Sequence, residues 1–170
     1  MEKYSKKFVT LHWLHALLLA FLLIGATLKM PDLPKVGGDL SSFKMHIIIG
    51  VLALILLIIR VILVKKEPEF PLYNSPKDIL VKLNHSLIYL FIFISAFSGM
   101  ATAKISNLGS VVLFGANPST YTGVTPLVEK LASIHSISTT ILMVLIAMHI
   151  IGVVLYIIQT KDNVIKKMWF

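Results

Sequence analysis

The chain contains no cysteine among its 170 residues. This absence excludes disulfide bonds, thiolate zinc sites and iron–sulfur clusters held by cysteine. Charged residues make up only 14% of the sequence, whereas hydrophobic residues make up 56%. A soluble domain of this size cannot bury so much apolar surface, so we expect lipid to surround part of the chain. Redox chemistry, if present, must then use histidine or a bound organic cofactor.

Long apolar runs are what the sequence does contain. Four of them cover residues 8–30, 43–64, 83–103 and 132–159, and each reaches the roughly 20 residues that a helix needs to cross a bilayer. The first run is too long for the apolar part of a signal peptide and lacks a clear small-residue cleavage site. These runs predict an all-α fold, a four-helix transmembrane bundle in one domain spanning residues 1–170.

The basic residues are unevenly distributed around these spans. The net charge is +8, and with the N-terminus inside, the outer segments hold only five of the 16 basic residues, Lys29, Lys35, Lys44, Lys104 and Lys130. The positive-inside rule therefore predicts that both termini are cytoplasmic. We interpret the basic clusters as topology signals at a membrane surface and expect no nucleic-acid partner.

The last span carries two histidines, His135 and His149. Fourteen residues at 3.6 per turn return the second imidazole to within roughly 40° of the first, about 21 Å further along the helix. Imidazoles are costly in lipid and usually mark a functional site. Two on one stripe, one near each side of the membrane, predict ligands for two stacked cofactors.

Two more histidines lie at matching depths in other spans. From the span centres, His12 lies roughly 10 Å and His149 roughly 6 Å towards the inside, while His46 lies roughly 10 Å and His135 roughly 15 Å towards the outside. Bis-histidine haem needs two axial nitrogens facing each other, so the pattern predicts two haems. A zinc site usually needs three or four converging ligands. The alternative for any single histidine is an interfacial anchor or a polar contact between helices.

Two further histidines have open roles. His15 follows His12 by three residues, so it is either the inner ligand itself or a hydrogen-bonding neighbour of that ligand. His85 begins the third span at the level of the inner pair. A haem propionate contact, a place in a quinone pocket and a helix cap are all compatible with its position.

One arginine and two glycines complete the candidate set. Arg60, the only arginine, lies at the inner end of the second span, where it can grip a haem propionate or act as a snorkelling anchor. Gly50, one turn after His46, and Gly152, close to His149, lack the Cβ that obstructs a flat macrocycle. Close helix packing through small residues explains them equally well.

Several motifs occur in a distinctive order, and together they resemble the bacterial cytochrome b-561 family. They are His12-Trp13, Met45-His46-x3-Gly50, His85-Ser86-Leu87-Ile88-Tyr89-Leu90, the gap from His135 to His149, and Lys161-Asp162-Asn163-Val164. The resemblance covers nearly the whole chain. The same histidine spacing recurs in the cytochrome b subunits of formate dehydrogenases and nickel–iron hydrogenases.

The resemblance implies two haem b groups in a multi-pass protein of the bacterial inner membrane. By position, His12 and His149 would hold the iron of the inner haem, and His46 and His135 that of the outer haem; the match favours His12 over His15. Resemblance to the small stand-alone members of the family implies that this chain is an oxidoreductase that passes electrons from periplasmic superoxide to ubiquinone. Two features differ from the family pattern: Arg60 is not followed by further arginines, and the long outer loop is different. Because that loop would shape the entry site, the resemblance does not determine the substrate.

Three functional hypotheses follow. The leading one is a di-haem superoxide:quinone oxidoreductase, with the outer lysines attracting the superoxide anion. The alternative is a membrane anchor and electron conduit for a separate redox partner subunit, a hydrogenase or dehydrogenase. The third is a haem-free interaction protein or small transporter. In the long outer loop, residues 104–131, the apolar segment 111–114 is expected to lie against the outer leaflet or to cover the end of the bundle.

Overall fold

The computed structural model describes residues 5–29, 39–66 and 76–169. Four long helices dominate it: α1 (Lys6–Lys29), α2 (Ser41–Lys66), α3 (Pro76–Ile105) and α5 (Pro126–Thr160). Each is long and apolar enough to cross a membrane, and no strand occurs in the described residues. The predicted all-α, four-span fold is therefore confirmed.

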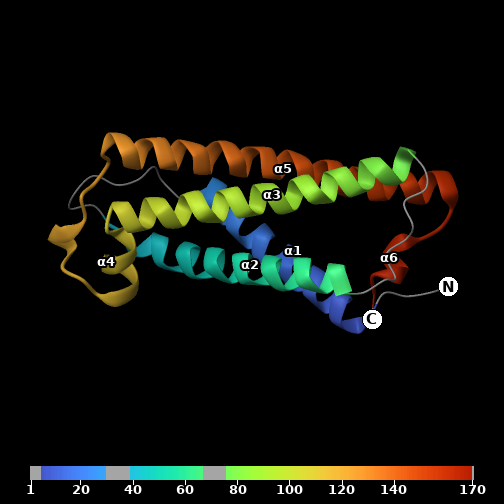
Figure 1. The fold of residues 1–170 in the computed structure, drawn as a ribbon, viewed down its shortest axis with the longest axis horizontal. Helices are drawn as coiled ribbons and strands as arrows, with labels where there is room; N and C mark the ends of the chain where they lie inside the picture. Colours follow the sequence, from blue (N-terminus) through green and yellow to red (C-terminus); the bar gives the residue numbers. More distant parts are fainter. Residues whose placement is uncertain (1–4, 30–38, 67–75, 170) are drawn as a thin grey trace.

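The four helices run side by side, and short helices lie at both ends of the bundle (Figure 1). Helix α4 (Leu108–Phe114) and the 3₁₀ turn η1 (Pro118–Thr120) lie at one end, called the α4 end below. Helix α6 (Val164–Lys167) lies at the other, the α6 end, where α1 begins and α5 finishes.

All four helices begin before the apolar runs that predicted them, and α3 and α5 do so by the most. Helix α5 begins at Pro126 because Thr125 caps it: the Thr125 side chain accepts a hydrogen bond from the backbone N–H of Val128, and proline suits the first helical position. At α2, the Asp39 carboxylate accepts hydrogen bonds from the backbone N–H and the hydroxyl of Ser41. These bonds lower the pKa of the Asp39 carboxyl.

Small residues explain why α3 and α5 form the most extensive helix contact. Ser95, Ser98 and Thr102 are buried on α3, and their hydroxyls donate to carbonyl oxygens of the same helix. The Ser95 hydroxyl also lies 3.0 Å from that of the buried Ser138 on α5. Small side chains with satisfied hydroxyls let two helix backbones approach closely inside a membrane.

The other side of the bundle is looser. Helix α1 packs along α2, and α2 along α3, but the backbones of α1 and α2 approach that of α5 at few points. A cluster of buried apolar side chains from α2, α3 and α5 fills the middle: Leu57, Ile88, Ile92, Leu142 and Leu145. Leu142 is seven residues from both His135 and His149, so this cluster separates the two levels at which the paired histidines lie.

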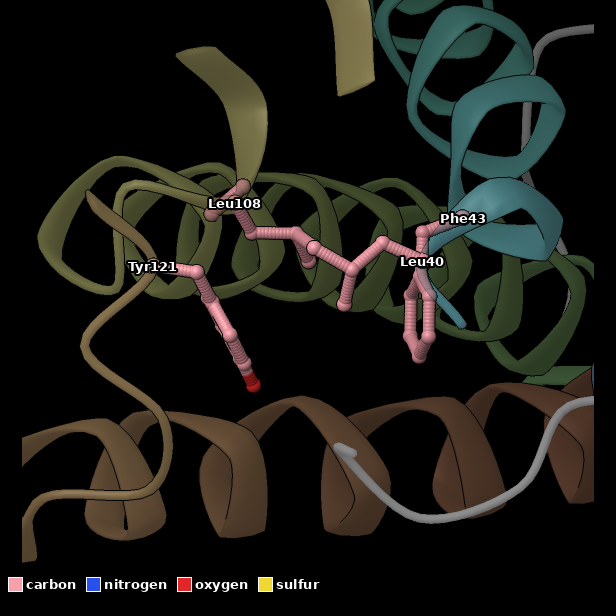
Figure 2. Close-up of a cluster of buried hydrophobic side chains, with 5 residues drawn as sticks. Leu40, Phe43, Leu108 and Tyr121 are labelled. Carbon is pink, nitrogen blue, oxygen red and sulfur yellow. The ribbon is translucent and has the colours of Figure 1, made fainter. Parts of the chain in front are cut away.

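The predicted long outer loop is shorter and more ordered than expected, because α3 continues to Ile105 and α4 follows almost at once. Leu108 of α4 packs with Leu40, Phe43, Ala103 and Tyr121 into a second cluster, called the α4-end cluster (Figure 2). Tyr121 points its hydroxyl towards α5 in this view, and burial raises the pKa of its phenol.

The apolar segment 111–114 covers the end of the bundle, which was one of its two expected roles. Val111 and Val112 pack against the α4-end cluster and so cover the end of the bundle. Phe114 is 84% exposed, which leaves its ring available to an apolar environment. The long helices likewise expose large apolar side chains, including Leu17, Phe97 and Ile150, as surfaces facing lipid do.

Candidate haem-binding site

Two pairs of histidine rings face each other across the bundle, one pair near each end. His12 of α1 and His149 of α5 have ring centroids 6.4 Å apart, with an angle of 58° between the ring planes. His46 of α2 and His135 of α5 have centroids 5.9 Å apart, at 77°. The structure thus brings together the same pairs that spacing and depth predicted.

The separation of the rings suits a metal bound between them. A metal–imidazole bond is about 2 Å long, so two imidazoles on opposite sides of one ion have centres roughly 6 Å apart. Both measured separations lie close to this value. The chemistry of two neutral nitrogen donors on opposite sides also matches the axial ligation of a b-type haem.

The two glycines near the paired histidines, Gly50 and Gly152, are not packed against other atoms. A Cβ atom built on Gly50 or on Gly152 would meet no atom within 4 Å. Neither glycine therefore serves close helix packing in this structure, which was the rival interpretation.

His135 is the most firmly held of the four paired histidines. Its Nδ1 lies 2.7 Å from the backbone carbonyl oxygen of Ser95. Since a carbonyl only accepts, Nδ1 carries the proton and Nε2 of the neutral ring keeps its lone pair for a metal. Gly99 lies against the same ring: a Cβ at this position would be 3.0 Å from Cε1 and Nδ1 of His135.

Gly99→Val is therefore expected to displace the His135 ring, because valine places a branched side chain where even a Cβ is crowded; if His135 is a haem ligand, the haem content falls. The reduced-minus-oxidised spectrum and the haem content per chain measure this loss. Gly25→Val is the matched control, since a Cβ there meets no atom within 4 Å. Retention of all haem by Gly99→Val contradicts a ligand role for His135.

Arg60 lies beside the His12–His149 pair. Its side chain is buried, with only 6% exposed, and Nε donates to the hydroxyl of Tyr89 at 2.9 Å. Its Nη2 lies 2.8 Å from Nδ1 of His12, and its guanidinium carbon lies 5.2 Å from the ring centre of Phe8. A guanidinium can hold a carboxylate through two parallel hydrogen bonds, so this position suits a ligand that carries a carboxylate.

The contact between Arg60 and His12 has a consequence for ligation. A guanidinium only donates, so Nδ1 of His12 accepts and the proton of the neutral ring lies on Nε2. Metal ligation through Nε2 requires that nitrogen without its proton. Ligation of iron by Nε2 would therefore require Arg60 to release His12.

The two remaining histidines lie near the same pair. His15 is 2% exposed, and its Nε2 has no hydrogen-bond partner in the described part of the chain; His12, rather than His15, faces the ring of His149. The ring centre of His85 lies only 4.7 Å from that of His149, which leaves no room for an ion between them. Nδ1 of His85 donates to the carbonyl oxygen of Val81.

Sequence reasoning did not identify several residues around the pairs. Ser95 and Gly99 hold His135, Tyr89 holds Arg60, and Trp13 touches His12 with ring centroids 5.4 Å apart. Tyr89 and Trp13 were visible as parts of motifs but without a role. The serine and glycine spacing on α3 was a usable signal, since small residues one turn apart indicate close helix contact.

Comparison with known protein families identifies the family of this chain. A family model described as prokaryotic cytochrome b561 matches residues 3–170. The chain belongs to this family. No curated protein and no solved structure matches it. This cytochrome b561 is therefore a multi-pass membrane protein of the b-type cytochromes, and its role is electron transfer.

Proposed function

We propose that this cytochrome b561 binds two haem b groups as one domain, residues 1–170, and passes electrons from superoxide to a quinone such as ubiquinone. The observation that carries the proposal is the pair of facing histidine couples at different levels of one bundle. His12 and His149 would hold one iron, and His46 and His135 the other. Bound haem supplies reversible one-electron chemistry, and the protein sets its position and access.

Arg60 has the role of propionate partner in this proposal. With haem bound, its guanidinium would hold a propionate carboxylate through a bidentate pair in place of its contact with Nδ1 of His12, and Nε2 of His12 would then be free to hold the iron. Tyr89 keeps the guanidinium in place through its bond to Nε. His85 lies against His149, where it contacts a propionate or the quinone. Gly50 and Gly152 leave room for the macrocycles.

The α4 end has a charge that favours superoxide. Lys44, Lys104 and Lys130 are exposed there, against the carboxylates of Asp39 and Glu129 in the described residues. A positive potential raises the capture rate of a small anion. The α6 end holds more basic residues, among them Lys6, Lys65 and Lys166. By the positive-inside rule we therefore assign the α6 end, with both termini, to the cytoplasm and the α4 end to the periplasm, in the bacterial inner membrane. Two superoxide anions are oxidised to dioxygen while one quinone takes up two electrons and two protons.

The test begins with the purified protein. A pyridine haemochrome assay is expected to give two haem b groups per chain. The oxidised protein is then mixed with a superoxide source and ubiquinone, and haem reduction and quinol formation are followed. Rapid reduction that superoxide dismutase abolishes supports the oxidase activity, and Lys104→Glu should slow it most at low salt.

The outcomes separate the candidate functions. Two haems that superoxide does not reduce, in a protein that a separate dehydrogenase does reduce, indicate an electron conduit for a partner subunit. A protein without haem after expression with adequate iron and haem precursor overturns both redox functions.

A further inference from the structure

The two ligand-bearing helices facing α5 are anchored in different ways. Near His46, the start of α2 is packed into the α4-end cluster, where Phe43 joins Leu108 of α4 and Tyr121. Near His12, the start of α1 packs along α2, where Phe8, Val9 and Leu11 are buried, but it approaches α5 at few points. Packing of α1 directly against α5 therefore does little to fix the distance from His12 to His149.

After α5, the chain turns back towards α1. Lys161 adopts a left-handed conformation with φ of 58°, and its backbone N–H closes the helix on the carbonyl oxygen of Ile157. A lysine in this conformation costs energy and requires support from its surroundings. Next, the Asn163 side chain accepts from the backbone N–H groups of Ile165 and Lys166 and so starts α6. The reversal is thus built by specific local bonds.

The returning segment contacts Trp13, the residue next to His12. The indole Nε1–H of Trp13 donates to the carbonyl oxygen of Met168 at 2.6 Å, and the rings of Trp13 and Trp169 meet edge to face with centroids 6.1 Å apart. The Trp13 ring itself lies against that of His12. In Figure 1, α6 lies between the end of α5 and the start of α1.

We propose that residues 161–169 form a strap that holds the start of α1 to the end of α5 and thereby places His12 opposite His149. Trp13, Met168 and Asn163 act as positioning residues for this pair. The proposal rests on the proposed function only in the claim that the positioned pair holds haem. The strap itself is a property of the polypeptide and is testable without any cofactor.

The first experiment measures the strap in the haem-free protein. Because the chain has no cysteine, Thr10→Cys on α1 and Gln159→Cys on α5 provide unique sites for two spin labels, and both residues are exposed. Pulsed dipolar spectroscopy gives the distance distribution between them. Trp13→Phe, Asn163→Ala and deletion of residues 161–170 are each expected to broaden it, with the deletion largest. Lys166→Ala, an exposed strap position, is the control. An unchanged distribution in the deletion variant overturns the strap.

The second experiment compares the two haems. Transfer of haem to apomyoglobin is followed separately for each spectral component. Trp13→Phe is expected to accelerate loss of the His12–His149 haem about fivefold, the size of one net hydrogen bond, and Asn163→Ala should act in the same direction. The haem between His46 and His135 should leave at the wild-type rate. Equal acceleration of both haems, or of neither, contradicts the positioning role.

The two experiments keep the claims distinct. A wild-type protein without two haems refutes the proposed function, whereas the spin-label distances still decide whether the strap exists. A tail deletion that broadens the distances and leaves both haems unaffected shows a strap with no part in ligation, and this overturns the inference as stated.

Discussion

His135→Ala is expected to abolish the haem signal at the α4 end and to leave the other largely intact, and His149→Ala is expected to do the reverse. Each substitution would remove one of the two nitrogens proposed to hold that haem, and the facing ring cannot hold a six-coordinate haem alone. The selectivity follows from the structure, since the buried cluster around Leu57 and Leu142 separates the two pairs. Reduced-minus-oxidised spectra and haemochrome quantification should fall from two haems per chain to one.

His15→Leu is the control for both ligand variants. His15 lies three residues from His12 on α1, is more deeply buried than His12, and has an Nε2 without a partner in the described residues. Its replacement by an apolar side chain of similar size removes an unsatisfied polar group, so both haem signals should persist. Loss of a haem from this variant, or identical spectra for the wild type and both alanine variants, shows that the ligands are assigned wrongly.

Gly50→Phe is expected to exclude the haem between His46 and His135 while the helix itself tolerates the change. Without haem, a Cβ at position 50 meets no atom within 4 Å, so the packing of the polypeptide alone predicts little effect. If a macrocycle fills that space, the phenyl ring occupies the same volume and binding is lost. Haem content and the thermal unfolding of the haem-free protein together separate the two cases.

Ile55→Phe provides the matched control, because Ile55 lies nine residues after His46 and thus on the opposite face of α2. It is 46% exposed, so the larger ring extends into lipid. This variant should keep both haems. Full haem content in Gly50→Phe places the macrocycle elsewhere and refutes the proposal that Gly50 leaves room for it.

Much of the fold was predictable because a bilayer imposes simple rules. Helices must satisfy their own backbone hydrogen bonds and must be about 20 residues long, so the four spans followed from apolar runs alone. The helix ends did not, because they depend on local caps such as Thr125 and on contacts such as those of Leu108. A hydropathy profile reveals neither the caps nor the packing contacts.

The candidate site, too, could be predicted from the sequence only in part. Depth along a helix follows from residue number, and for this reason the spacing of the histidines is enough to match His12 with His149 and His46 with His135. The surroundings of each ring could not be predicted, since Ser95 and Gly99 are distant in sequence from His135 and Arg60 is distant from His12. Such contacts depend on how the helices are rotated and which of them pack together.

By itself, the sequence determined that this protein spans a membrane four times and presents histidines at two levels, since length, hydropathy and helical period are properties of single segments. Only the tertiary structure decided which elements hold those histidines: a tight α3–α5 contact behind His135, a buried guanidinium on His12, and a returning segment against Trp13. The physical reason is that pairing across a bundle depends on the shapes and hydrogen bonds of side chains far apart in the chain. The residue pattern within a single helix does not reveal these contacts.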